Sequence, residues 1–280
     1  MEILVSSEWL AGELGASDLV ILDASRHLLD AGRDALGEFK VGHIPGARFL
    51  DLASLTDTGS SVPAALPDAA QLSERLATLG VAPDSRIVLY DDSAVKTASR
   101  AWFTLKAHGI DRVAILDGGL AKWRNEGRPL ETGSSKITAT QAVPLADADG
   151  VRTKADMLAN IDTQREQVLD ARSADRVFGS GIDPVHGGEN GRIPGALNLP
   201  FGKVFAADGT FKSPDDLRAA FESAGLDMDK PVVTTCGSGV TAAVLLFALR
   251  LTSKDDVALY DGSWMEWNAD PDTPKAQGPE

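Results

Sequence analysis

The chain has 280 residues, 43% hydrophobic and 24% charged, so one large domain or two ordinary ones could bury a sizeable core. Its formal net charge of −14 argues against nucleic acid or an anionic membrane as a partner, since both would repel it. A single cysteine excludes an intrachain disulfide and is typical of a reducing compartment, so we expect a cytoplasmic location. We expect neither a signal peptide nor a membrane span, which would need about 20 apolar residues.

Short apolar runs alternate with amphipathic stretches along the chain. In the first half we predict strands at residues 19–22, 48–50, 87–90 and 113–116, and helices at 69–79 and 98–108. In the second half we predict strands at 168–169, 196–199, 232–235 and 257–260, and helices at 214–224 and 240–251. This alternation predicts the α/β class, with mostly parallel sheets covered by helices on both faces.

The chain contains an internal repeat. Three segments recur in the same order at nearly one offset: Leu22-Asp-Ala-Ser25 with Leu169-Asp-Ala-Arg172, Gly42-His-Ile-Pro-Gly-Ala47 with Gly191-Arg-Ile-Pro-Gly-Ala196, and Ile115-Leu-Asp-Gly-Gly-Leu-Ala-Lys-Trp123 with Leu259-Tyr-Asp-Gly-Ser-Trp-Met-Glu-Trp267. Such a repeat indicates two homologous domains. We predict a first domain at 1–136, a linker at 137–150 and a second domain at 151–280.

The only cysteine, Cys236, lies between the predicted strand 232–235 and the predicted helix 240–251. A helix N-terminus carries about half a positive charge, and its free N–H groups favour an anionic sulfur. The alternative is a structural cysteine that packs as a small hydrophobe, but such a residue would not need a glycine-rich loop. We therefore predict Cys236 as a nucleophile. The predicted active-site loop comprises Gly237, Ser238, Gly239, Val240 and Thr241.

The first half lacks this nucleophile. The repeat places Asp91 opposite Cys236, so we expect the first half to be non-catalytic and to wall one side of a cleft.

These motifs resemble those of the two-domain sulfurtransferases of the rhodanese superfamily, most closely the 3-mercaptopyruvate sulfurtransferases. The matching segments are the Cys236 loop, the Ile-Pro-Gly-Ala runs at Ile44 and Ile193, and Tyr260-Asp-Gly-Ser-Trp-Met-Glu-Trp267. The resemblance covers essentially the whole chain. It implies two tandem rhodanese-like domains, and transfer of sulfur from 3-mercaptopyruvate to a thiol or cyanide acceptor through a Cys236 persulfide. We expect no cofactor and no metal.

The resemblance also implies how the donor is held. Thiosulfate enzymes of the superfamily carry Arg and Lys after the cysteine, whereas Gly237 and Ser238 stand here and suit a weaker anion. Arg176 matches the arginine that binds the donor carboxylate, a role for which its fork is suited. A second family arginine is missing, and His186 or Arg192 would replace it.

The family often pairs the loop serine with a histidine from the first domain, but residues 49–67 contain none. Ser238 is therefore expected to act only as a hydrogen-bond donor. With no second cysteine, the persulfide must pass to an external acceptor, either a small thiol or a thioredoxin-like protein.

Three alternatives remain at this point. The donor could be thiosulfate, or the chain could be a non-catalytic sulfur carrier or regulatory module. A cysteine phosphatase is disfavoured, because position 242 is alanine and no basic residue lies between Cys236 and Arg250.

Overall fold

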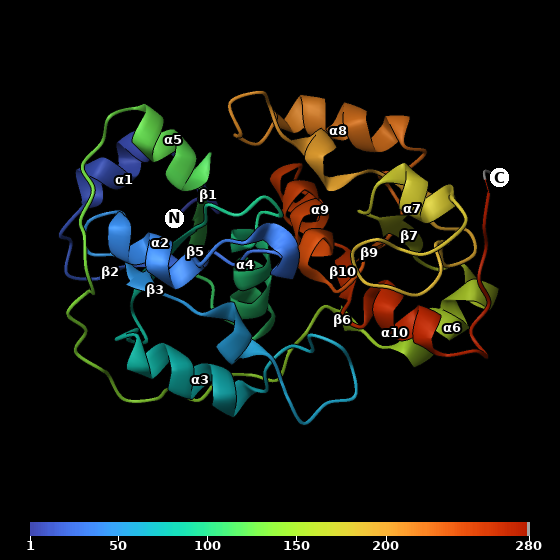
Figure 1. Cartoon of the computed structure of the whole chain (residues 1–280), viewed down its shortest axis with the longest axis horizontal. Helices are drawn as coiled ribbons and strands as arrows, with labels where there is room; N and C mark the ends of the chain where they lie inside the picture. Colours follow the sequence, from blue (N-terminus) through green and yellow to red (C-terminus); the bar gives the residue numbers. More distant parts are fainter. Residues whose placement is uncertain (279–280) are drawn as a thin grey trace. The chain divides into compact units, whose positions relative to one another are not determined.

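Residues 1–278, which the computed structural model describes, form two compact units (Figure 1). The first contains Met1–Asp57, Leu66–Asp149 and Ala207–Phe211. The second contains Thr58–Ala65, Gly150–Ala206 and the chain from Lys212 onward. Each unit builds a five-stranded sheet of its own.

The sheet of the first unit has the order β1-β5-β4-β2-β3, and every neighbouring pair is parallel. Its strands are β1 (Leu4–Val5), β2 (Leu19–Asp23), β3 (Arg48–Phe49), β4 (Arg86–Tyr90) and β5 (Val113–Leu116). Its helices are α1 (Ser7–Glu13), α2 (Ala35–Val41), α3 (Ala69–Thr78), α4 (Ala98–Ala107) and α5 (Gly119–Asn125).

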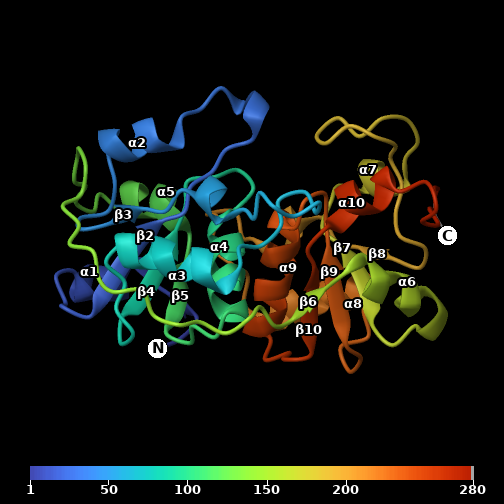
Figure 2. The same cartoon turned by 90° about the horizontal axis from the view of Figure 1, so that it is seen from below.

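The sheet of the second unit repeats this topology with the order β6-β10-β9-β7-β8, again parallel throughout. Figure 2 shows the strands of this sheet gathered between α9 and α6. The strands are β6 (Val151–Arg152), β7 (Gln167–Asp170), β8 (Leu197–Asn198), β9 (Val232–Thr235) and β10 (Val257–Tyr260). The helices are α6 (Lys154–Thr163), α7 (Ala174–Phe178), α8 (Pro214–Ser223), α9 (Val240–Leu251) and α10 (Ser263–Ala269).

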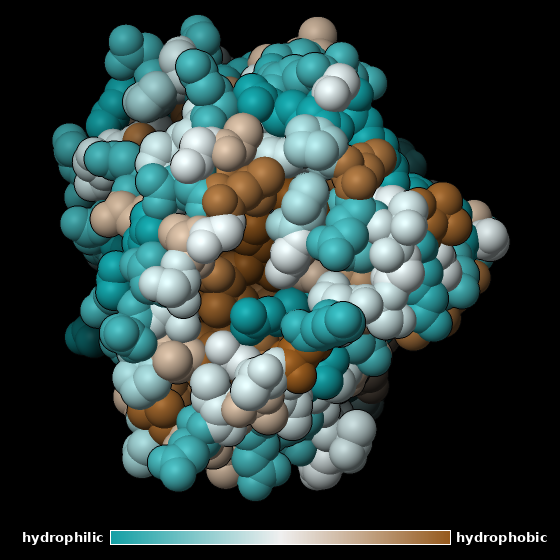
Figure 3. Space-filling model, turned by 90° about the vertical axis from the view of Figure 1, so that its left-hand side faces the viewer, coloured by the Kyte–Doolittle hydropathy of each residue, from teal (hydrophilic) through white to brown (hydrophobic). Residues whose placement is uncertain are grey.

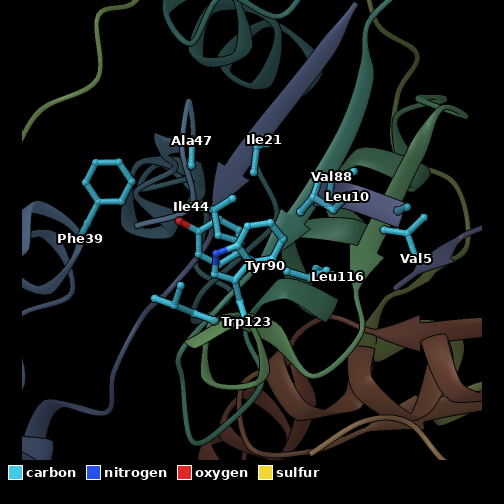
Figure 4. Close-up of a cluster of buried hydrophobic side chains, with 12 residues drawn as sticks. Val5, Leu10, Ile21, Phe39, Ile44, Ala47, Val88, Tyr90, Leu116 and Trp123 are labelled. Atoms are coloured by element: carbon cyan, nitrogen blue, oxygen red, sulfur yellow. The ribbon is translucent and has the colours of Figure 1, made fainter. Parts of the chain in front are cut away.

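Each sheet is buried on both faces, as a parallel sheet with crossover helices requires. In β4, Ile87, Val88 and Leu89 are all fully buried although successive side chains point to opposite faces. One face of the first sheet packs against α1, α2 and α5, where the rings of Tyr90 and Trp123 lie close together beside Ile44 (Figure 4). The repeated Ile-Pro-Gly-Ala segment thus contributes a core residue.

The predicted α/β class is confirmed, and all eight predicted strands and four predicted helices coincide with observed elements. The sequence reading missed α1, α2, α5, α6, α7 and α10 and the edge strands β1 and β6. Both edge strands have two residues, too few to display an alternation. Helix α6 buries only Met157 and Asn160, so its apolar pattern is weak.

The segment from residue 137 to 149 has no helix or strand and packs on the first unit. The His108 ring links this segment to the first unit. Its Nδ1 lies 2.7 Å from the carbonyl oxygen of Ala146 in the segment, and its Nε2 lies 3.1 Å from the carbonyl oxygen of Pro67. The backbone N–H of Thr140 donates to Ala77 at 3.0 Å. His108 therefore has a structural role.

The surface in Figure 3 is mainly polar, with apolar residues gathered in a recess between polar ones. This accords with the 41 acidic and 27 basic side chains of the sequence. Among the described helices, none combines the length and hydropathy that crossing a membrane would require.

Candidate active site

Cys236 lies at the carboxyl end of β9, a central strand of the second sheet. Ligands of open parallel sheets bind at this edge. The chain then turns through Gly239, whose φ of +78° is left-handed, and enters α9 at Val240. Only 2% of the Cys236 surface is exposed, and the thiol is free. The local sequence thus produces the predicted strand, loop and helix around the sulfur.

Helix α10 holds the cysteine loop by three hydrogen bonds. The N–H of Cys236 donates to Ser263 Oγ at 3.2 Å. The N–H groups of Trp264 and Met265 donate to the carbonyls of Cys236 and Gly237 at 2.9 and 3.0 Å. Because C=O and N–H point in opposite directions across a trans peptide, these bonds turn the N–H groups of Gly237 and Ser238 away from α10.

These two N–H groups make no hydrogen bond to any described residue. Unpaired backbone N–H groups in succession, just before a helix, can bind an anion. The loop therefore offers donors to an anionic sulfur or to the negative charge of a reacting donor molecule.

A buried ion pair lies beside this loop. Asp183, 1% exposed, accepts hydrogen bonds from Arg176 Nε at 2.9 Å and Nη2 at 2.6 Å. The same Nη2 lies 2.8 Å from His186 Nδ1. Burial alone would raise the pKa of Asp183, but the Arg176 guanidinium and the N–H groups of Val185 and His186 hold that pKa below its ordinary value. Asp183 is therefore an anion that fixes both neighbouring side chains.

His186 is a neutral acceptor in this arrangement. Burial, and then the positive charge of Arg176, lower the pKa of His186 below its ordinary value. Neutral imidazole can accept the Arg176 N–H at Nδ1 and keep a proton on Nε2. A histidine at position 186 thus offers a hydrogen-bonding group and little positive charge.

The imidazole of His186 also packs on the cysteine loop. A Cβ atom added at Gly237 would lie 2.1 Å from His186 Cε1, far closer than atoms can approach. The structure therefore places His186 against the Cys236 loop, and Arg176 bonds to His186. It also gives a steric reason for glycine at position 237.

Arg192 occupies a different environment. It is 2% exposed, its guanidinium lies 4.9 Å from the Phe178 ring centroid, and its Nη1 donates to the Gly278 carbonyl. Its backbone pairs with Ala276. The contacts described for Arg192 thus run to Phe178 of α7 and to the C-terminal segment, and none of them reaches the Cys236 loop. His186 is therefore the better candidate for the second donor-binding position.

Sequence reasoning missed three supporting residues. Asp183 carried no signal beyond an Asp-Pro dipeptide. Ser263 lies in the Asp-Gly-Ser-Trp segment, which the sequence marks only as part of the repeat and of the family resemblance. Arg172 is buried, pairs with Asp170 at 2.7 Å and lies 4.7 Å from the Trp264 ring centroid. The internal repeat held a signal for Ser263, since its counterpart is Gly119.

The equivalent loop of the first unit is closed by its own carboxylate. Asp91 accepts hydrogen bonds from the N–H groups of Ser93 at 2.9 Å and Ala98 at 2.7 Å. Burial raises the pKa of Asp91 to about 6. Leu120 donates to the Asp91 carbonyl at 3.1 Å, as Trp264 does to that of Cys236. Asp91 therefore occupies the structural position of the cysteine.

The rhodanese-like domain model matches residues 6–126 and 153–270 of the chain. The chain thus belongs to the rhodanese family, with two rhodanese-like domains, and it is a sulfurtransferase.

Individual relatives cover nearly the whole chain. The 3-mercaptopyruvate sulfurtransferase of Mus musculus is 40% identical over 94% of this chain and 91% of its own. The thiosulfate sulfurtransferase of Cricetulus griseus is 35% identical over 98% and 95%. The crystal structure of the 3-mercaptopyruvate sulfotransferase SseA from Escherichia coli aligns with a TM-score of 0.85, at 35% identity over 94% of this chain and 99% of that one.

Proposed function

We propose that this sulfurtransferase moves sulfur from 3-mercaptopyruvate to an external acceptor through a persulfide on Cys236. The observation that carries the proposal is the loop itself. Its thiol lies at the carboxyl end of the central strand β9, and hydrogen bonds from Trp264 and Met265 turn two of its N–H groups away from α10. Arg176 and His186 beside it supply the means to hold a small carboxylate.

The first half-reaction starts with the Cys236 thiolate. It attacks the thiol sulfur of the donor, a sulfur–sulfur bond forms, and the carbon–sulfur bond breaks. The electron pair goes to carbon as pyruvate enolate, which takes up a proton to become pyruvate. The N–H groups of Gly237 and Ser238 stabilise negative charge near the sulfur, as preorganised donors do in an oxyanion hole.

The second half-reaction returns the enzyme to its starting state. An acceptor thiolate or cyanide attacks the outer sulfur, the sulfur–sulfur bond breaks, and the Cys236 thiolate is released. Because the sequence has one cysteine, no internal disulfide can form and the acceptor must be a separate molecule. A small thiol or a thioredoxin-like protein fits this requirement, and nucleic acid and membranes are not expected partners. A cytoplasmic location stays a prediction from the single cysteine.

The donor assignment follows from charge. Arg176 uses Nε and Nη2 on Asp183 and His186, which leaves Nη1 for a single carboxylate. The loop contains no basic residue that would favour the dianion thiosulfate. The thiosulfate sulfurtransferase relative keeps that donor as the alternative.

Mass spectrometry of the intact protein tests the proposal. After incubation with 3-mercaptopyruvate, the wild type should gain one sulfur atom that a thiol reductant removes, whereas Cys236→Ser should gain none. A larger kcat/KM for thiosulfate than for 3-mercaptopyruvate would reverse the donor assignment. No gain of sulfur with either donor would favour a non-catalytic module.

A further inference from the structure

Ser263 has a backbone conformation that is unfavourable for serine. Its φ of +50° lies in the left-handed region, which glycine enters freely and other residues seldom do. Such strained residues cluster at functional sites, where the surrounding structure keeps them in place. The position of Ser263 directly after β10, facing the cysteine loop, makes this strain informative.

The first half of the repeat uses glycine at the equivalent position. Gly119 has a φ of +59°, and a Cβ atom there would lie 2.5 Å from the Asp91 carbonyl oxygen. The same turn can therefore be built without strain when the residue opposite is not a cysteine. The second half instead accommodates a side chain at a position where the backbone favours glycine.

The Ser263 hydroxyl joins the cysteine loop to β10. Its Oγ accepts the hydrogen bond from the Cys236 N–H and donates to the Tyr260 carbonyl at 2.9 Å. Ser263 is fully buried, so no water can replace it without a rearrangement. With glycine at this position, the buried N–H of Cys236 would lose its partner, which is costly in a protein interior.

We propose that Ser263 is a positioning residue for sulfur transfer, whose hydroxyl fixes the Cys236 peptide so that the sulfur stays beside the N–H groups of Gly237 and Ser238. The proposal rests on the assignment of Cys236 as the nucleophile. Ser263 fixes the peptide before the sulfur-bearing carbon, and Trp264 and Met265 fix the two that follow.

Two substitutions separate positioning from mere structural support. Ser263→Gly removes the hydroxyl and relieves the strain, whereas Ser263→Ala removes the hydroxyl and retains the strain. Ser73→Ala is the matched control, because Ser73 is a buried serine of the first unit that bonds the Val143 carbonyl. Each variant is assayed for thermal unfolding, for alkylation of Cys236 by iodoacetamide across pH, and for kcat and KM with 3-mercaptopyruvate.

We expect both Ser263 variants to lower kcat and the alkylation rate at neutral pH by about fivefold to tenfold, the equivalent of one hydrogen bond, with KM changed less than about twofold. The pH profile of alkylation should move to higher pH in both. Ser263→Gly should unfold at a higher temperature than Ser263→Ala, yet be no more active. Ser73→Ala should leave kcat and the alkylation profile unchanged.

The proposal is overturned if Ser263→Gly keeps the wild-type kcat and alkylation profile, because the residue would then serve only the fold. Failure of both variants to fold would overturn it in the same way. The outcome is distinguishable from failure of the proposed function. If wild-type protein takes no sulfur from 3-mercaptopyruvate, the function fails, while the alkylation comparison still reports on Ser263.

Discussion

The loops after β4 and β9 have the same backbone arrangement but differ in what their N–H groups bind. Both follow the central strand of a parallel sheet, and both carbonyls at the turn accept a hydrogen bond from the segment after the next strand. In the first loop, the Asp91 carboxylate accepts hydrogen bonds from the N–H of Ser93 in the loop and from that of Ala98 at the start of α4. In the second, the N–H groups of Gly237 and Ser238 have no partner among the described residues. The comparison teaches that the fold places backbone N–H groups at this turn in both units. The residue at the end of the strand, Asp91 or Cys236, decides whether a carboxylate of the chain itself binds them or they stay available to a ligand.

The largest expected effect is on sulfur transfer and comes from replacing Cys236, the residue that distinguishes the second loop from the first. Cys236→Ser should reduce transfer to the uncatalysed background, because a hydroxyl does not form a persulfide. It should unfold like the wild type, since the substitution is nearly isosteric. Steady-state turnover and a urea titration check the two halves of this prediction. Residual transfer above background would mean that another residue is the nucleophile.

The next effect concerns the charged side of the open loop. Arg176→Ala should raise KM for 3-mercaptopyruvate by about 10- to 100-fold, because a charge-assisted hydrogen bond to a carboxylate contributes about 1.5–3 kcal/mol. Arg176→Lys should recover only part of the loss, since lysine lacks the planar fork that bonds Asp183. An unchanged KM in Arg176→Ala would remove this side chain from the donor site.

A smaller effect tests the contact between His186 and the loop. Gly237→Ala should lower kcat/KM by about tenfold, because the new methyl group displaces the imidazole. In a His186→Ala background the same substitution should cost nothing more. Gly202→Ala is the control, since no atom lies within 4 Å of the added Cβ. Equal losses in both backgrounds would mean that the two residues act independently.

The smallest effect concerns Asp91 in the loop after β4 and is seen in the free energy of unfolding. The pKa of Asp91 is about 6 in the folded protein, against an ordinary value of 3.8 for an aspartate side chain, so the folded state binds the proton more tightly. The contribution of Asp91 to the unfolding free energy is therefore largest below about pH 4 and is lost as the pH rises through about 6.

Between pH 4.5 and 7, the unfolding free energy of the wild type should fall by about 2 kcal/mol more than that of Asp91→Asn. Urea titrations of both proteins at the two pH values measure this difference, and sulfur transfer at neutral pH should be unaffected. Parallel pH dependence in the two proteins would contradict a raised pKa for Asp91 in the folded state.

The sequence was sufficient for features that are local or repeated. The internal repeat predicted two α/β domains, and the order of strand, cysteine and glycine-rich turn predicted the loop around Cys236. It was insufficient where residues far apart in sequence meet. Asp183 matters because folding places it against Arg176, and Ser263 matters because α10 returns to the cysteine loop. Such contacts leave no periodic pattern in the chain.

The carboxylate of Asp91 has a consequence for stoichiometry. A chain with two homologous domains would carry two sulfur atoms if each loop held a cysteine. In the first loop, however, the position of the cysteine is taken by Asp91, whose carboxylate forms no persulfide and stays bonded to nearby N–H groups. Each molecule then accepts one sulfur before it must meet an acceptor. Without acceptor, the burst of pyruvate should therefore equal one molecule for each chain, and quench-flow measurement of that amplitude would count the working sites directly.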